Sequence, residues 1–148
     1  MYKHILIPTD GSSLADKAVD AGLDYARDAG AKVTFFIAVP EYQLPGEAQI
    51  YAHQRVISIG EHEERSRNTA NACLAAAVIK ASAVGVECAT DYALNDNPAQ
   101  AIIDAARRNR CDAIFMASHG RKGLAALLHP SETIAVLTHS DIPTLVYR

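Results

Sequence analysis

Short apolar segments of strand type alternate with longer segments of helical pattern, and this alternation limits the possible folds more than any other feature. The apolar composition is typical of strands that are buried on both faces of a parallel sheet, although the third segment is more polar and suits a sheet edge. The strand-type segments are His4–Pro8, Lys32–Val39, Val86–Leu94, Cys111–Ala117 and Thr144–Arg148, and the helical segments are about 13–28, 53–83, 99–110 and 131–140. This alternation predicts an α/β fold with a mainly parallel, five-stranded sheet and helices on both of its faces.

The connections between the strands predict their order in the sheet. Right-handed crossovers favour the order 3-2-1-4-5, a doubly wound arrangement that reverses between the first and fourth strands. Ligands of such sheets bind at the carboxyl ends of the strands that flank the reversal. The loops at those ends are residues 8–13 and 117–131, and we expect a binding site where they meet.

The second of these loops has the composition of an anion-binding turn. It reads SHGRKG from Ser118 to Gly123, and Ser131 opens the next helical pattern. Loop amides and a helix N-terminus can direct several N–H groups at one anion. Because glycine turns after strands are common, the segment alone leaves two readings open, a phosphate site and an ordinary turn.

Size, charge and cysteine content limit the class of protein. A chain of 148 residues suits one domain, residues 1–148, and its net charge of −3 provides no basic field for nucleic acid. No apolar run approaches the roughly 18 residues of a membrane span, and the first ten residues lack a signal-peptide pattern. Cys73, Cys88 and Cys111 are scattered without CxxC spacing, which indicates reduced thiols and a cytoplasmic location.

The chain resembles the universal stress protein family over essentially its whole length. The resemblance rests on the opening KHILIPTDGS, the segment KVTFFIAV, the segment MASHGRKGLAALLHPSET and the terminal IPTLVYR, in this order and spacing. It implies a Rossmann-like domain that forms homodimers. Some members of the family bind ATP and others do not. The resemblance therefore implies a regulatory site for ATP or another adenine nucleotide, bound with or without Mg²⁺.

The resemblance also implies where the nucleotide would lie. Asp10 would meet the ribose and adenine region, with Pro8 and Thr9 beside it, and Ala38 would offer backbone groups to the adenine edge. The loop after the fourth strand and the helix start that follows it would face the phosphates. The residues that this mapping selects are Pro8, Thr9, Asp10, Ala38, Ala117, His119, Gly120, Arg121, Ser131 and Thr133.

Two positions depart from the family's pattern of glycine, two residues, glycine, nine residues, then glycine and Ser or Thr. Ala117 stands at the first glycine, and Pro130 stands at the last, directly before Ser131. Alanine can keep a backbone contact wherever φ is negative. Proline has no N–H, so it removes one donor from the phosphate site, while Arg121 and Lys122 add positive charge there.

Several residues have a plain structural reading beside the functional one. Asp10 suits a ribose or Mg²⁺ contact and equally a turn before glycine. His119 suits a ligand contact or a solvated loop, Cys111 suits a buried thiol better than a nucleophile, and Glu61–Arg65 suits a solvated helix face. The spacing of His119, His129 and His139 aligns no face of a helix or strand, so we expect no metal site there.

Three functions are compatible with these residues. The first is regulatory binding of an adenine nucleotide, and the second is a dimeric interaction module of the same fold without nucleotide. The third is nucleotide enzymology, which we do not expect, because the sequence has no SGGxDS, HIGH or GxxxxGK[ST] motif.

Two further expectations concern assembly and motion. The apolar strand Thr144–Tyr147 should lie at a sheet edge and pair with its copy around a two-fold axis. Residues 40–52 contain two prolines and a glycine without periodicity, and we expect them to form a mobile loop that acts as a flap over the adenine side of the site.

Overall fold

The computed structural model describes residues 1–41, 52–118 and 130–148, and it describes residues 52–59, 130 and 131 by their backbone alone. Strands and helices alternate along the chain, as the composition predicted. Their bounds are β1 (His4–Pro8), α1 (Ser13–Ala29), β2 (Lys32–Val39), α2 (Ala52–Ala83), β3 (Cys88–Leu94), α3 (Pro98–Arg108), β4 (Ala113–Ala117), α4 (Pro130–His139) and β5 (Thr144–Tyr147).

The five strands form one parallel sheet in the order β3-β2-β1-β4-β5, which confirms the predicted topology. The order reverses between β1 and β4, where Ile5 lies beside Ala113 and Leu6 beside Ile114. β3 and β5 are the two edges of the sheet. All strands therefore end on one side, which is the side where parallel α/β sheets bind their ligands.

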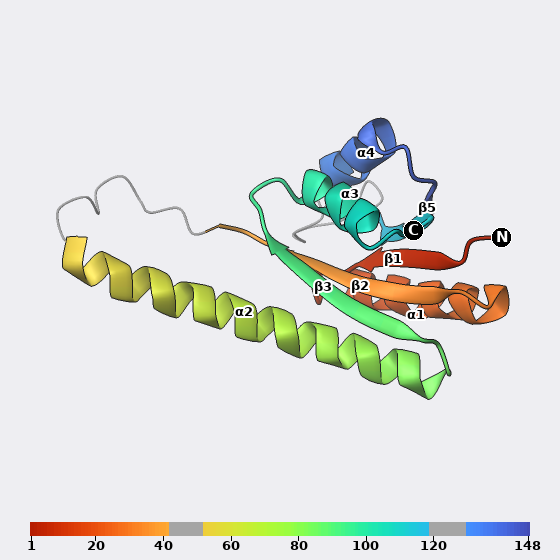
Figure 1. Cartoon of the computed structure of the whole chain (residues 1–148), viewed down its shortest axis with the longest axis horizontal. Helices are drawn as coiled ribbons and strands as arrows, with labels where there is room; N and C mark the ends of the chain where they lie inside the picture. The colour runs from red at the N-terminus through yellow and green to blue at the C-terminus, as the bar shows by residue number, and fades with distance from the viewer. Residues whose placement is uncertain (42–51, 119–129) are drawn as a thin grey trace.

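Helices cover both faces of the sheet (Figure 1). Successive residues of a strand point to opposite faces, so Ile5 and Ile7 pack in one core with α1 and α2, while Leu6 packs in the other with α3. Phe35 and Phe36 divide between the two cores in the same way, and both are fully buried. This burial on both faces explains why the strand segments read as continuous apolar runs.

Local chemistry sets the ends of the helices. The Ser12 side chain caps α1 by accepting a hydrogen bond from the Ala15 N–H, and Gly30 ends the helix with a left-handed backbone at φ 62°. After α3, Arg110 has a left-handed backbone at φ 55°, a conformation that glycine usually adopts. The helix therefore ends at Arg108, two residues before the predicted end. Arg107 and Arg108 then pair with Asp141 and Asp91, so two arginines of the expected basic helix end also tie α3 to its neighbours.

The long helix α2 has two parts with different surroundings. Ala70, Leu74, Ala77 and Ala81 are buried against the sheet, whereas residues 60–65 are exposed. Figure 1 shows the first part of α2 reaching beyond the carboxyl ends of the strands. The predicted loop 40–52 falls mostly on residues 42–51, which lie outside the described residues, so its expected mobility stays a prediction.

Candidate functional site

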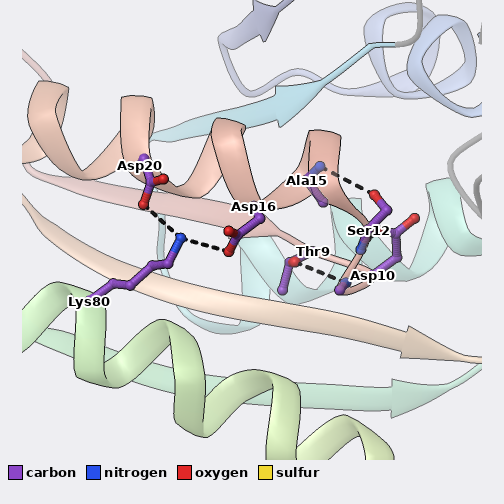
Figure 2. A network of polar contacts seen from close by, with 8 residues as sticks. Thr9, Asp10, Ser12, Ala15, Asp16, Asp20 and Lys80 are labelled. Atoms are coloured by element: carbon purple, nitrogen blue, oxygen red, sulfur yellow. Dashed lines mark hydrogen bonds and ion pairs between the residues drawn. The ribbon is translucent and has the colours of Figure 1, made fainter.

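The turn after β1 is a compact, hydrogen-bonded structure at the carboxyl edge of the sheet. The N–H of buried Thr9 donates to Phe36 O on β2 at 2.9 Å, which fixes the start of the turn. Gly11 has φ 76°, a left-handed conformation that favours glycine. The Ser12 N–H donates to Asp10 Oδ1 at 2.8 Å, and Figure 2 shows Asp10 beside this cap at the start of α1. One Asp10 oxygen thus forms the turn, and the second carboxylate oxygen accepts no hydrogen bond from the residues that the structure describes.

A cleft of about 320 Å³ opens where the turn, the end of β2 and α2 meet. Asp10 lines it from the turn, and residues 37–40 line it from the end of β2. A neighbouring cavity of about 40 Å³ is lined by Pro8, Thr9, Asp10 and Ala38. Four of the residues selected from the sequence therefore lie together, although they come from two different strands and the turn between β1 and α1.

The expected phosphate side lies at the end of β4. Thr133 is buried on α4, and its hydroxyl donates to Ala117 O at 3.4 Å, which ties the start of α4 to the end of β4. Ala117 and Thr133 therefore lie together, but they do not line the 320 Å³ cleft. His119, Gly120 and Arg121 lie outside the described residues, and Ser131 is described by its backbone only.

The wall of the cleft that sequence reasoning missed comes from α2. The segment Glu61–Arg65 suited a solvated face, and its residues are indeed exposed, yet some of its side chains also line the cleft. The α2 residues along this wall are His62, Arg65, Ser66, Thr69, Ala70 and Cys73. Their spacing of three or four residues continues the stripe that packs on the sheet further along the helix, and this period was the available signal.

Cys73 lies deep in this wall, next to the turn. A Cβ atom added to Gly11 would lie 3.3 Å from Cys73 Sγ, so the helix and the turn are in close contact. Burial raises the pKa of the Cys73 thiol, and the nearby Asp10 and Asp16 carboxylates add to this effect, although a hydrogen bond with Thr9 opposes it. A thiol with a raised pKa is a weak nucleophile at neutral pH, so we assign Cys73 a packing role.

An ion pair network holds α2 against α1 close to the cleft. Lys80 Nζ lies 2.7 Å from Asp16 Oδ1 and 2.8 Å from Asp20 Oδ1, as Figure 2 shows. Burial disfavours the charge of Lys80, but the hydrogen bonds to the two carboxylates outweigh it and raise the Lys80 pKa. Lys80 therefore stays charged at neutral pH, and the network fixes the α2 wall relative to α1.

The polar side chains of the site do not form a metal-binding cluster. Within the described ranges, no group of three or more His, Cys, Asp or Glu side chains is arranged to hold a metal ion. The ring of His139 lies against its own helix, with Nδ1 2.9 Å from Ala135 O. Among the described helices, none is both long and apolar enough to cross a membrane.

Comparisons with known proteins agree on one family. The model of the Universal stress protein family matches residues 1–148. The universal stress protein YxiE of Bacillus subtilis is 28% identical over 153 residues, and the match covers 100% of both chains. The solved structure of a universal stress protein family member from Burkholderia pseudomallei is 25% identical and has a TM-score of 0.70, with 99% of this chain and 96% of that chain covered.

A further solved structure resembles the fold and contains a ligand. It is the universal stress protein from Archaeoglobus fulgidus in complex with dAMP, with 19% identity, a TM-score of 0.69, and 99% and 98% of the two chains covered.

Proposed function

The chain belongs to the universal stress protein family, and from this premise we propose that it is a regulatory protein that binds an adenine nucleotide. The base and ribose would occupy the cleft between β2, α2 and the turn after β1. The observation that carries the proposal is the meeting of Asp10 and Ala38 in one cleft of about 320 Å³, because these residues come from separate segments of the chain. The A. fulgidus relative in complex with dAMP supports the same ligand class.

The lining of the cleft fits a nucleoside. Its volume lies near the lower end of the range for small-molecule sites, about 300–1,000 Å³. Ile37, Ala38, Val39 and Pro40 provide an apolar surface for a base, and a carboxylate such as Asp10 accepts hydrogen bonds from ribose hydroxyls. The apolar surface and the accepting carboxylate therefore fit the nucleoside half of the ligand.

The part of the site that would bind the phosphates has fewer hydrogen-bond donors than the family's pattern provides. α4 begins at Pro130, so the first residue of the helix has no N–H to offer to a phosphate. Proline is well tolerated at this position of a helix. The missing N–H therefore lowers the affinity for phosphate and leaves the stability of the helix unchanged. We therefore propose that a nucleoside monophosphate binds about as well as ATP, and that Mg²⁺ changes affinity little.

Calorimetric titration with AMP and with ATP, each with and without Mg²⁺, tests the proposal. Asp10→Asn should weaken AMP binding by about tenfold, because it replaces a charged hydrogen bond to ribose with a neutral one. Asp24→Asn is the matched control, since Asp24 lies on exposed α1 surface and pairs with Arg27. Absence of binding by the unchanged protein would refute the proposal and favour an interaction module of the same fold.

We also propose a homodimer formed through β5. β5 is a sheet edge with half-buried side chains, and an edge strand of this kind presents unpaired backbone groups to another chain. On α4, the helix that precedes β5 in the chain, Ile134 and Leu137 are 62% and 51% exposed, and we propose that this apolar surface lies in the same interface. Pairing of two β5 strands around a two-fold axis would satisfy the backbone groups and cover this surface.

The proposal includes no catalytic step and places the protein in the cytoplasm. The absence of a GxxxxGK[ST] motif from the sequence and the raised pKa of Cys73 favour binding over chemistry at this site. The cytoplasmic location rests on three cysteines, all of which are free thiols in the structure.

A further inference from the structure

The α2 wall brings one cation into the cleft. Arg65 is exposed and lines the cleft together with Asp10 and Pro40. Its backbone carbonyl accepts a hydrogen bond from Thr69 at 2.9 Å, but its guanidinium makes no ion pair with any other residue in the described part of the chain. By contrast, Lys80 on the same helix is held by two carboxylates. The Arg65 guanidinium is therefore available to a ligand.

The position of Arg65 indicates which end of a nucleotide it would meet. The cleft is lined by residues 37–40 at the end of β2 and by Asp10 after β1, and none of the described residues that line it comes from β4 or α4. The loop expected to face phosphate follows β4, which lies beyond β1 from β2 in the sheet. Arg65 thus lies on the base side of the site and away from the phosphate side.

The chemistry of arginine suits a base at this place. A guanidinium is planar and weakly hydrated, and it stacks on the flat face of an aromatic ring. The Pro40 ring and the end of β2 line the same cleft, so they offer an apolar surface for the base beside the helix. We propose that Arg65 is a base-contacting residue, whose guanidinium stacks on the purine and closes the cleft from the α2 side. The inference rests on the proposed function and names a residue that extends its site beyond the strand ends.

Titration of Arg65 variants with AMP and with adenosine tests this contact. Arg65→Ala should lower the affinities for AMP and for adenosine by the same factor, about fivefold to tenfold, because the two ligands share the base. Arg65→Lys should recover little of the lost affinity, since lysine keeps the charge but not the planar group. Arg67→Ala is the matched control, because Arg67 lies two residues further along α2 and does not line the cleft; it should leave both affinities unchanged.

The outcomes separate this inference from the function on which it rests. A loss for AMP alone, or full recovery with lysine, would mean that the charge acts on phosphate and would overturn the base contact. Unchanged affinities in Arg65→Ala would overturn it as well, while leaving nucleotide binding by the protein intact. If the unchanged protein binds neither ligand, the proposed function fails first and the inference fails with it. Circular dichroism of each variant verifies that α2 is still folded.

Discussion

At the scale of single residues, Gly22 in α1 shows how tightly the sheet and its helices pack. A Cβ atom at this position would lie 2.6 Å from Ile7 Cδ1 and 3.1 Å from Phe115 Cδ1. Overpacking of this kind costs about 1–3 kcal/mol, which exceeds the gain of about 1 kcal/mol from replacing a helical glycine by alanine. We therefore expect Gly22→Ala to lower the free energy of unfolding, as measured by urea denaturation.

Two further variants identify the cause of that loss. Gly60→Ala in α2 is the control, because nothing lies within 4 Å of the added Cβ, and it should stabilise the protein. Ile7→Val removes the Cδ1 atom that clashes, so the double variant should lose less stability than the two single changes added together. Simple additivity would show that the close approach to Ile7 is not the source of the loss.

His4 gives stability a pH dependence at the opposite edge of the sheet from the cleft. Its Nε2 atom lies 2.8 Å from the hydroxyl of buried Thr34. Burial lowers the His4 pKa below its ordinary value of 6.5, and Lys32 lowers it further against the opposing charges of Asp112 and Glu87. The unfolded chain therefore binds more protons than the folded chain, so stability should fall as the pH drops below 6.5.

Thermal melts of the unchanged protein and of His4→Gln measure this effect. The loss of melting temperature between neutral pH and about pH 5 should be smaller in the variant, which has no imidazole to protonate. Asp112 does not interfere in this range, because hydrogen bonds from the backbone of His4 and Lys3 outweigh its burial and lower its pKa below 3.8. Parallel pH profiles for the two proteins would contradict the prediction.

At the scale of elements, the start of α4 forms part of the proposed phosphate side of the site. Pro130 is the first residue of this helix, where a residue with an N–H would add one donor to an anion site. Pro130→Gly should strengthen ATP binding by about tenfold, which corresponds to one recovered charge-assisted hydrogen bond, and should change AMP binding little. Calorimetry with both ligands provides the measurement.

Pro130→Ala separates the two effects of this substitution. Alanine also restores the N–H, but it lacks the backbone freedom of glycine, so it should strengthen ATP binding to a similar extent. If only the glycine variant gains affinity for ATP, backbone flexibility at residue 130 is the cause of the gain, and the restored N–H is not. Equal strengthening of AMP and ATP would show that residue 130 does not act at the phosphate end.

Helix α2 shows where sequence reasoning succeeds and where it fails. The alanine-rich stripe through Leu74 predicted a packed helix up to Gly85, and that part is buried on the sheet. His62 and Arg65 were assigned to a solvated face. Charged residues near the start of a helix have the same sequence pattern whether they face solvent or line a cleft. Their place in the cleft depends on how far the helix continues past the strand ends, which is a tertiary property.

At the scale of the whole molecule, the sheet order was predictable because crossover handedness leaves few alternatives. The strands are buried on both faces, as at Ile5, Leu6 and Ile7, and that pattern is visible in the sequence. The topology predicted a site at the loop that contains Asp10, whereas the place of Ala38 beside it was implied only by the family resemblance. The expected phosphate side includes His119, Gly120 and Arg121, which lie outside the described residues, and it stays a prediction because strand order constrains strands and not the loops between them.

Assembly is the property of the whole molecule that a strand-edge variant tests. Pro143 O and Tyr147 O accept hydrogen bonds from the N–H groups of Ile114 in β4 and of Ser118 directly after it, and the alternation of a parallel ladder then directs the Val146 N–H outward. Val146→Pro removes that donor without removing a bond within the sheet, so it should convert the proposed dimer into a folded monomer. Sedimentation velocity and circular dichroism measure mass and fold, and an unchanged dimer mass would exclude pairing through β5.

The parallel direction of all five strands has a consequence for how this chain can evolve. The groups that hold the amino edge of the sheet, such as Asp112 and His4, are separated from the cleft by the full length of the strands. Selection can therefore alter Arg65 or Pro130, and with them the proposed site, with little effect on folding. Proteins with this architecture can lose the ability to bind one ligand and later acquire the ability to bind another, while the fold stays the same.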